Sequence, residues 1–176
     1  MTTLGSTGKA RSESFDNKRK LFLVPLPSAM PEVDENNKDL FDRHWNSIQD
    51  QIENLEKSLG AIRHVFHELV HEGGDGATAI VSQVSPRSAA ICKRITDSSG
   101  VFEKTEDGDA LFEMHDWQRC ISIGLASEKV SKLAYEGYQD STNTRNEKIA
   151  ENIDEVLEDD GIGVLFISED HRVQFP

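Results

Sequence analysis

The sequence contains one short pattern that is typical of catalytic metal sites, His67-Glu68-Leu69-Val70-His71. On a helix, residues four apart share a face, so both imidazoles could bind one zinc ion while Glu68 activates the zinc-bound water. Zinc peptidases also need a third ligand, and no recognisable second motif supplies one. The pattern therefore predicts a divalent metal site, with His67 and His71 as zinc ligands, only if this segment is helical.

A second group of candidate residues is dispersed along the chain. Its members follow predicted strand ends or begin helices that face those ends. Carboxylates together with an arginine and a histidine could hold a metal ion, or act as acid and base on a carbonyl substrate. In a chain with 32 Asp and Glu residues, any single member could instead be an ordinary surface charge. The candidate catalytic residues are Glu68, Glu113, Asp116, Arg145 and His171, with Glu106 as a further carboxylate.

The element that would position these residues is the apolar run 162–167, which we predict to be a strand buried on both faces. A helical pattern precedes it and ends at Gly161. A helix, a glycine and a buried strand form half of a parallel-sheet unit. Ligands of such sheets bind beyond the carboxyl ends of the strands, which is where Glu169, Asp170 and His171 follow.

Upstream, residues 21–27 form a short apolar run that predicts a first strand. Apolar residues then recur at steps of three and four over 39–59, which predicts an amphipathic helix that packs on the core or on a partner. The segment 61–71 is open: it either continues this helix or forms a strand after Gly60 ends the helix, and we favour the strand.

The rest of the chain is predicted to be mainly helical. Residues 75–95 fit two helices, the second beginning at Pro86. A short strand is expected at 101–105, and a helical pattern over 109–139 is broken near 124–127. We expect 141–143 to interrupt this pattern and the last helix to begin near Thr144.

Composition limits the possible functions. The 176 residues carry a net charge of −13, which argues against a nucleic-acid partner. Residues 1–19 are predicted to be a disordered basic leader, and 20–176 a single domain. Two cysteines form no disulfide framework, and no apolar run is long enough to span a membrane, so we expect a cytoplasmic protein without a membrane partner.

Two stretches, from Glu103 to Cys120 and from Arg145 to His171, resemble a conserved family of prokaryotic cytosolic proteins of unknown function. The resemblance covers most of residues 21–176. More distantly, an arginine that opens a helix, followed by a strand that ends near a histidine, resembles the last motif of the TraB family and related α/β hydrolase-like proteins. This resemblance implies that Arg145 and His171 are site residues, with Glu68 as an earlier carboxylate. The chain departs from that family because its Gly-x-x-His motif is absent.

We therefore expect an α/β fold with a small, mostly parallel sheet covered by long helices. Two functions compete with the zinc peptidase. One is a hydrolase-like enzyme with its site at the strand ends. The other is a non-catalytic module that binds a protein partner, or a second copy of itself, through the helix 39–59. Because so small a sheet needs more edge, we also expect either a truncated C-terminus or a sheet completed by a partner.

Overall fold

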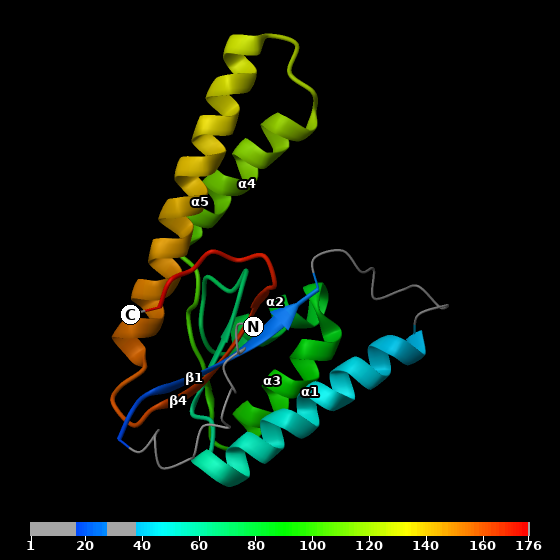
Figure 1. Cartoon of the computed structure of the whole chain (residues 1–176), viewed down its shortest axis with the longest axis vertical. Coiled ribbons are helices and arrows are strands. Elements are labelled where there is room, and N and C mark those ends of the chain that lie inside the picture. The colour runs from blue at the N-terminus through cyan, green and yellow to red at the C-terminus, as the bar shows by residue number, and fades with distance from the viewer. Residues whose placement is uncertain (1–16, 28–37, 176) are drawn as a thin grey trace, which may run out of the picture.

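The computed structural model of the chain describes residues 17–27 and 38–175. Its four strands form one parallel sheet in the order β1-β4-β2-β3, which confirms the predicted α/β class. Helices surround this sheet (Figure 1). In chain order the elements are β1 (Lys20–Leu26), α1 (Lys38–Leu59), β2 (His64–His67), α2 (Asp75–Val84), α3 (Pro86–Ser98), β3 (Val101–Phe102), α4 (Gly108–Ser122), α5 (Glu128–Val156) and β4 (Ile162–Ser168).

Strand β4 lies inside the sheet, between β1 and β2, as its apolar sequence predicts. Val164 is in register with Phe22 of β1 and with Val65 of β2. Every residue from Ile162 to Ile167 is buried. A strand with parallel neighbours on both sides and helices on both faces has no solvent-facing side chains, so it requires a continuous apolar run rather than an alternating one.

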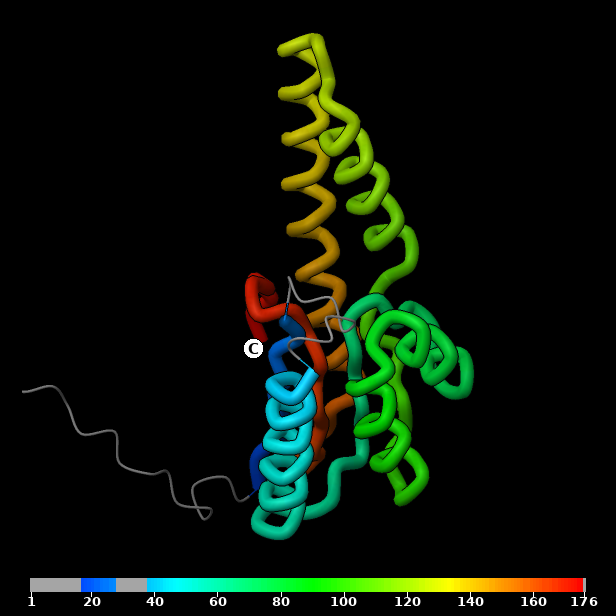
Figure 2. Tube along the Cα trace, turned by 90° about the vertical axis from the view of Figure 1, so that its right-hand side faces the viewer, coloured from blue at the N-terminus to red at the C-terminus, as the bar shows by residue number. Residues whose placement is uncertain are grey.

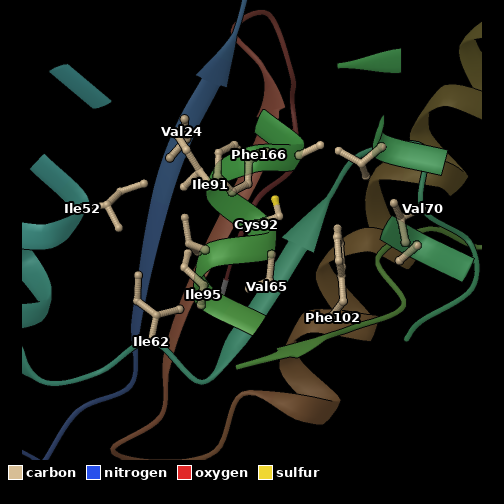
Figure 3. Close-up of a cluster of buried hydrophobic side chains, with 14 of the residues drawn as sticks. Val24, Ile52, Ile62, Val65, Val70, Ile91, Cys92, Ile95, Phe102 and Phe166 are labelled. Carbon is tan, nitrogen blue, oxygen red and sulfur yellow. The ribbon is translucent and has the colours of Figure 1, made fainter. Parts of the chain in front are cut away.

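The two faces of the sheet have separate cores. On one face, Ile162, Val164 and Phe166 pack with side chains of α1 and α3, including Ile52 and Ile91 (Figure 3). On the other face, the alternate β4 residues Leu165 and Ile167 pack against the C-terminal half of α5; that core is completed by Phe66, Ile149, Ile153, Leu157 and Val173. The fold is therefore a helix–sheet–helix sandwich.

Helix α1 confirms the predicted 39–59 helix and shows what its apolar face contacts. Phe41, Trp45 and Ile52 are buried, and Trp45 and Ile52 belong to the core under the sheet. This face is therefore occupied within the chain and is not free for the partner that the sequence suggested. Gly60 follows with φ 112°, a conformation that favours glycine, and β2 begins four residues later. The strand interpretation of this segment is confirmed over His64–His67.

The predicted break at 141–143 is wrong. Helix α5 runs without interruption from Glu128 to Val156. Within this helix the hydroxyl groups of Ser141 and Thr142 donate to the carbonyl oxygen of Tyr138, at 3.2 and 2.6 Å, so both find a partner without interrupting it. The predicted break near 124–127 is confirmed, because α4 ends at Ser122 and α5 begins at Glu128.

Helix α4 and the N-terminal half of α5 form a hairpin that projects beyond the sheet (Figures 1 and 2). We call residues 108–143 the arm. No helix in the described ranges is long and apolar enough to cross a membrane. Most of the predicted leader, residues 1–16, lies outside the described residues.

Candidate functional site

The carboxyl ends of β2 and β4 are adjacent, and the chain leaves them toward opposite faces of the sheet. After β2 the chain continues to α2 and α3 on the first face. After β4 it turns back onto the α5 face, where Val173 is buried. Such a switch point opens a crevice between two strand ends, which is the usual ligand site of open parallel sheets.

Glu68 and Ser168 meet at this point. Glu68 directly follows β2, and Ser168 is the last residue of β4. The Ser168 hydroxyl donates to Glu68 Oε1 at 2.6 Å, and Arg145 Nη2 lies 3.6 Å from Glu68 Oε2. The Glu68 side chain is 12% exposed to solvent. A carboxylate fixed on both oxygens and still open to the cleft is a competent proton acceptor.

Glu106 fixes the position of Arg145 through a buried, hydrogen-bonded ion pair. The Glu106 side chain is fully buried, and both of its carboxylate oxygens accept hydrogen bonds from Arg145 Nε at 3.0 Å. Arg145 Nη2 also donates to Glu106 Oε1. Burial alone would lower the pKa of Arg145, but the hydrogen bonds and negative charge of Glu106, together with Glu68, raise it. The guanidinium is therefore a permanent, rigidly oriented cation.

The loops after β2 and β3 are joined, which fixes the position of Glu106. The backbone N–H groups of Thr105 and Glu106 donate to the Val70 carbonyl oxygen, at 3.0 and 2.9 Å. The N–H of His67 donates to the Thr105 hydroxyl at 3.0 Å, and Glu106 Oε1 also accepts from the N–H of Leu69 at 3.2 Å. The buried carboxylate is thus part of the frame of the site rather than a group in contact with solvent.

A cleft of about 610 Å³ opens above these groups. His171 lines it, and its Nδ1 is buried without a hydrogen-bond partner among the described residues. Unpaired buried nitrogens are rare in proteins and often mark functional positions. The cleft is lined by Glu68, Met114, Tyr138, Gln139, Asp140, Thr142, Asn143, Arg145, Asn146, Ser168, Asp170, His171 and Arg172.

The structure brings together three of the five predicted catalytic residues, Glu68, Arg145 and His171. Glu113 and Asp116 lie elsewhere, on α4, where they line a separate hollow of about 440 Å³. Glu113 accepts a hydrogen bond from Trp117 at 3.3 Å, and Asp116 pairs with Arg119 at 3.0 Å on the surface. They are not members of this site because they line a different side of α4 from Met114, the α4 residue that lines the cleft.

The helical alternative for residues 61–72 is wrong, and with it the geometry that a His-Glu-x-x-His zinc site needs. His67 ends β2, and His71 lies in the following loop. Both ring nitrogens of His67 are already engaged, Nδ1 with the Glu68 carbonyl oxygen at 2.6 Å and Nε2 with the Ser88 hydroxyl at 3.0 Å. Among the described residues, no group of three or more His, Cys, Asp or Glu side chains could hold a metal ion.

The contact of His67 with Ser88 is a packing arrangement. Burial lowers the pKa of His67, so the ring is neutral at pH 7. The Ser88 hydroxyl lies 3.0 Å from His67 Nε2 and also donates to the Ser85 carbonyl oxygen at 3.0 Å, so it is held on both sides. Ser88 has no exposed surface, and the His67 ring stacks on Phe166. A hydroxyl enclosed in this way cannot reach a substrate.

Two residues of the frame, Ser168 and Thr105, were absent from the predicted site. Ser168 was the detectable one, since it is the polar residue that ends the buried β4 strand. Thr105 acts through its hydroxyl on the His67 backbone, a contact that spans 38 positions and leaves no local pattern in the sequence.

Comparison with known proteins adds no family to this description. No protein-family model matches the chain. The curated proteins and the solved structures likewise give no significant match. The resemblances suggested by the sequence therefore stay predictions, and function has to be argued from the geometry of the cleft.

Proposed function

We propose that the chain is a hydrolase-like enzyme in which Glu68 acts as the general base in the strand-end cleft. The observation that carries the proposal is the position of its carboxylate, held by the Ser168 hydroxyl at 2.6 Å and by Arg145 at 3.6 Å while it lines a cleft of about 610 Å³. A base works when its lone pair is aimed at the proton it removes. Ser168 and Arg145 supply that orientation.

Arg145 is the electrophilic partner in this scheme. Glu106 uses the Nε and Nη2 edge of the guanidinium, while Nη1 donates no hydrogen bond to any described residue. Donors that are fixed before the reaction stabilise developing negative charge at little reorganisation cost. Arg145 is therefore suited to bind an oxygen that becomes negative during the reaction.

The charges around the cleft favour a neutral substrate such as an ester or an amide. The lining contains the two arginines Arg145 and Arg172 together with the carboxylates of Glu68, Asp140 and Asp170, so it carries no surplus of positive charge. A phosphate ester would bring further negative charge to this surface, at an electrostatic cost.

The reaction then proceeds in two steps. Glu68 takes a proton from water as the water oxygen bonds to the substrate carbonyl carbon, and the carbonyl electron pair moves to its oxygen beside Arg145. The tetrahedral adduct collapses, the bond to the leaving group breaks, and the leaving group takes the proton from Glu68. His171, in the same cleft, is placed to orient the leaving group.

The test is ester hydrolysis by the purified chain, with p-nitrophenyl acetate and butyrate as probes. We expect turnover above the buffer rate, and a loss of about 100-fold or more in kcat for Glu68→Gln, because the amide cannot accept the proton. Glu155→Gln is the matched control, since Glu155 is an exposed α5 carboxylate that does not line the cleft. Circular dichroism verifies that both variants fold.

Two results would contradict the proposal. One is a wild-type chain that hydrolyses neither ester faster than buffer. The other is a folded Glu68→Gln variant that keeps the wild-type kcat.

A further inference from the structure

The arm carries most of the exposed large apolar side chains in the described part of the chain. Of nine such residues, five lie on the arm: Phe112, Ile123, Val130, Leu133 and Tyr135. A projecting helical hairpin gains no fold stability from apolar residues on its outer surface. A cluster of this kind on a surface is typical of an interaction site.

Part of this surface is continuous along one side of the hairpin. On α5, Val130, Leu133 and Gly137 recur at steps of three and four and so share a face. On α4, Trp117 and Cys120 share a face for the same reason. The two faces join at Gly137, where an added Cβ would lie 2.4 Å from Trp117 Cε2, so the indole rests directly on the α5 backbone.

A hollow of about 440 Å³ lies on this side of α4, lined by Glu113, Asp116, Trp117 and Cys120. Trp117, which is half-buried, lines it together with two carboxylates, Glu113 and Asp116, that precede Trp117 in the helix and so lie nearer the sheet. An occupant of this hollow needs an apolar side chain with positive charge nearby. Leu133, 58% exposed, with Lys129 one turn before it on the same face, has that combination.

The charged residues on this side of the hairpin are also arranged so that two copies could complement each other. Lys129, near the tip, and Asp140, near the sheet, have no ion-pair partner among the described residues. They are 11 residues apart on one helix, or about 16 Å. In two antiparallel arms related by a two-fold axis near residue 134, Lys129 of each arm faces Asp140 of the other. Leu133 of each arm then meets the hollow beside Trp117 of the other.

We propose that the arm pairs with the arm of a second copy of this chain, antiparallel, through the side that carries Trp117, Cys120, Val130, Leu133 and Gly137. An isologous contact of this kind uses the same patch twice, as two-fold dimers require. The antiparallel arrangement also places the two acidic bodies at opposite ends of the paired arms. They are then separated by far more than the Debye length of about 8 Å at physiological ionic strength. The interface is short, so the dissociation constant is on the order of 10 μM.

Sedimentation velocity of the full chain from about 1 to about 200 μM tests the association, since this range brackets that constant. The expected result is a monomer at the low end and a dimer at the high end. Leu133→Glu weakens the dimer about tenfold or more, because it puts a carboxylate against the partner's acidic hollow. Tyr135→Glu is the matched control: Tyr135 is 54% exposed on the same helix but two residues away, on a different face, so the dimer persists.

The alignment of the two arms against each other is tested by charge-reversal variants and by crosslinking through a cysteine. Lys129→Asp and Asp140→Lys each weaken the dimer, and the double variant restores it. Cys120 lies near the two-fold axis and is half-exposed, whereas Cys92, the only other cysteine, is buried. A short bismaleimide therefore links two chains through Cys120, and Cys120→Ser abolishes the link. The proposal is overturned by a chain that stays monomeric throughout, or by a dimer that is indifferent to Leu133→Glu and to both charge changes.

Discussion

The pair formed by Glu106 and Arg145 makes a quantitative prediction about stability. Glu106 is fully buried and pairs among the described residues with Arg145 alone, whereas Arg145, 14% exposed, also lies 3.6 Å from Glu68. Breaking a buried pair by removing one partner costs about 3–5 kcal/mol. Because Arg145 retains some exposure and glutamine keeps one acceptor oxygen, we expect Glu106→Gln to cost about 3 kcal/mol. Arg145→Met leaves the carboxylate unpaired and should cost at least as much.

The double variant Glu106→Gln/Arg145→Met separates the charge effect from general damage. It removes both charges of the pair and leaves only Glu68, which is 12% exposed and hydrogen-bonded by Ser168, without its arginine. We therefore expect it to be more stable than the sum of the single changes predicts, by about 2 kcal/mol or more. The exposed pair of Asp116 and Arg119 is the matched control. Its contact is 3.0 Å long, but both side chains are more than 70% exposed, so Asp116→Asn should cost no more than about 0.5 kcal/mol.

Equilibrium unfolding in urea measures these differences. With a slope of about 2 kcal/mol per molar urea for a chain of this size, a loss of 3 kcal/mol lowers the midpoint by about 1.5 M. Far-ultraviolet circular dichroism follows all helices, while fluorescence reports on Trp45 in the body and Trp117 on the arm, so coincident transitions test two-state behaviour. Two results would show that the buried pair does not hold the site together. One is a free energy of unfolding for Glu106→Gln within about 0.5 kcal/mol of that of the wild type. The other is a double variant whose loss of stability equals the sum of the losses of the two single variants.

Three further predictions concern single positions. Burial lowers the pKa of His67 in the folded state below its ordinary value near 6.5. The unfolded chain therefore binds the extra proton first, and the free energy of unfolding falls as the pH drops below about 6.5. His67→Gln should remove this part of the pH dependence, which is up to about 1.4 kcal/mol per pH unit, in urea melts at pH 5 to 7. Gly60→Ala forces alanine to φ 112° and should cost about 1–2 kcal/mol, and an unchanged melting temperature would contradict this strain. Gly137→Ala puts a methyl group 2.4 Å from the Trp117 ring; it should destabilise the arm by about 1–3 kcal/mol despite the better helix propensity of alanine, and change the near-ultraviolet dichroism of tryptophan.

The sequence alone determined most of the architecture, because each element left a local signal. The continuous apolar run at 162–167 required a strand that is buried on both faces. The apolar residues of α1, which recur at steps of three and four, required a helix that is buried on one face. The Pro86 start of α3 follows from the fixed φ of proline. The failure at 141–143 is also physical. Serine and threonine weaken a helix only on average, and here their hydroxyls bond to the Tyr138 carbonyl within the same helix.

Only the tertiary structure decided which polar residues meet. Glu68 and Ser168 are 100 positions apart, and Glu106 and Arg145 are 39 apart. Their contacts depend on the strand order β1-β4-β2-β3 and on the opposite exits of β2 and β4. The strand ends predicted where polar side chains gather but not which ones, since Glu113 and Asp116 have the same residue types and line a different hollow on α4. Local sequence encodes local conformation and burial, whereas convergence of side chains depends on the path of the whole chain.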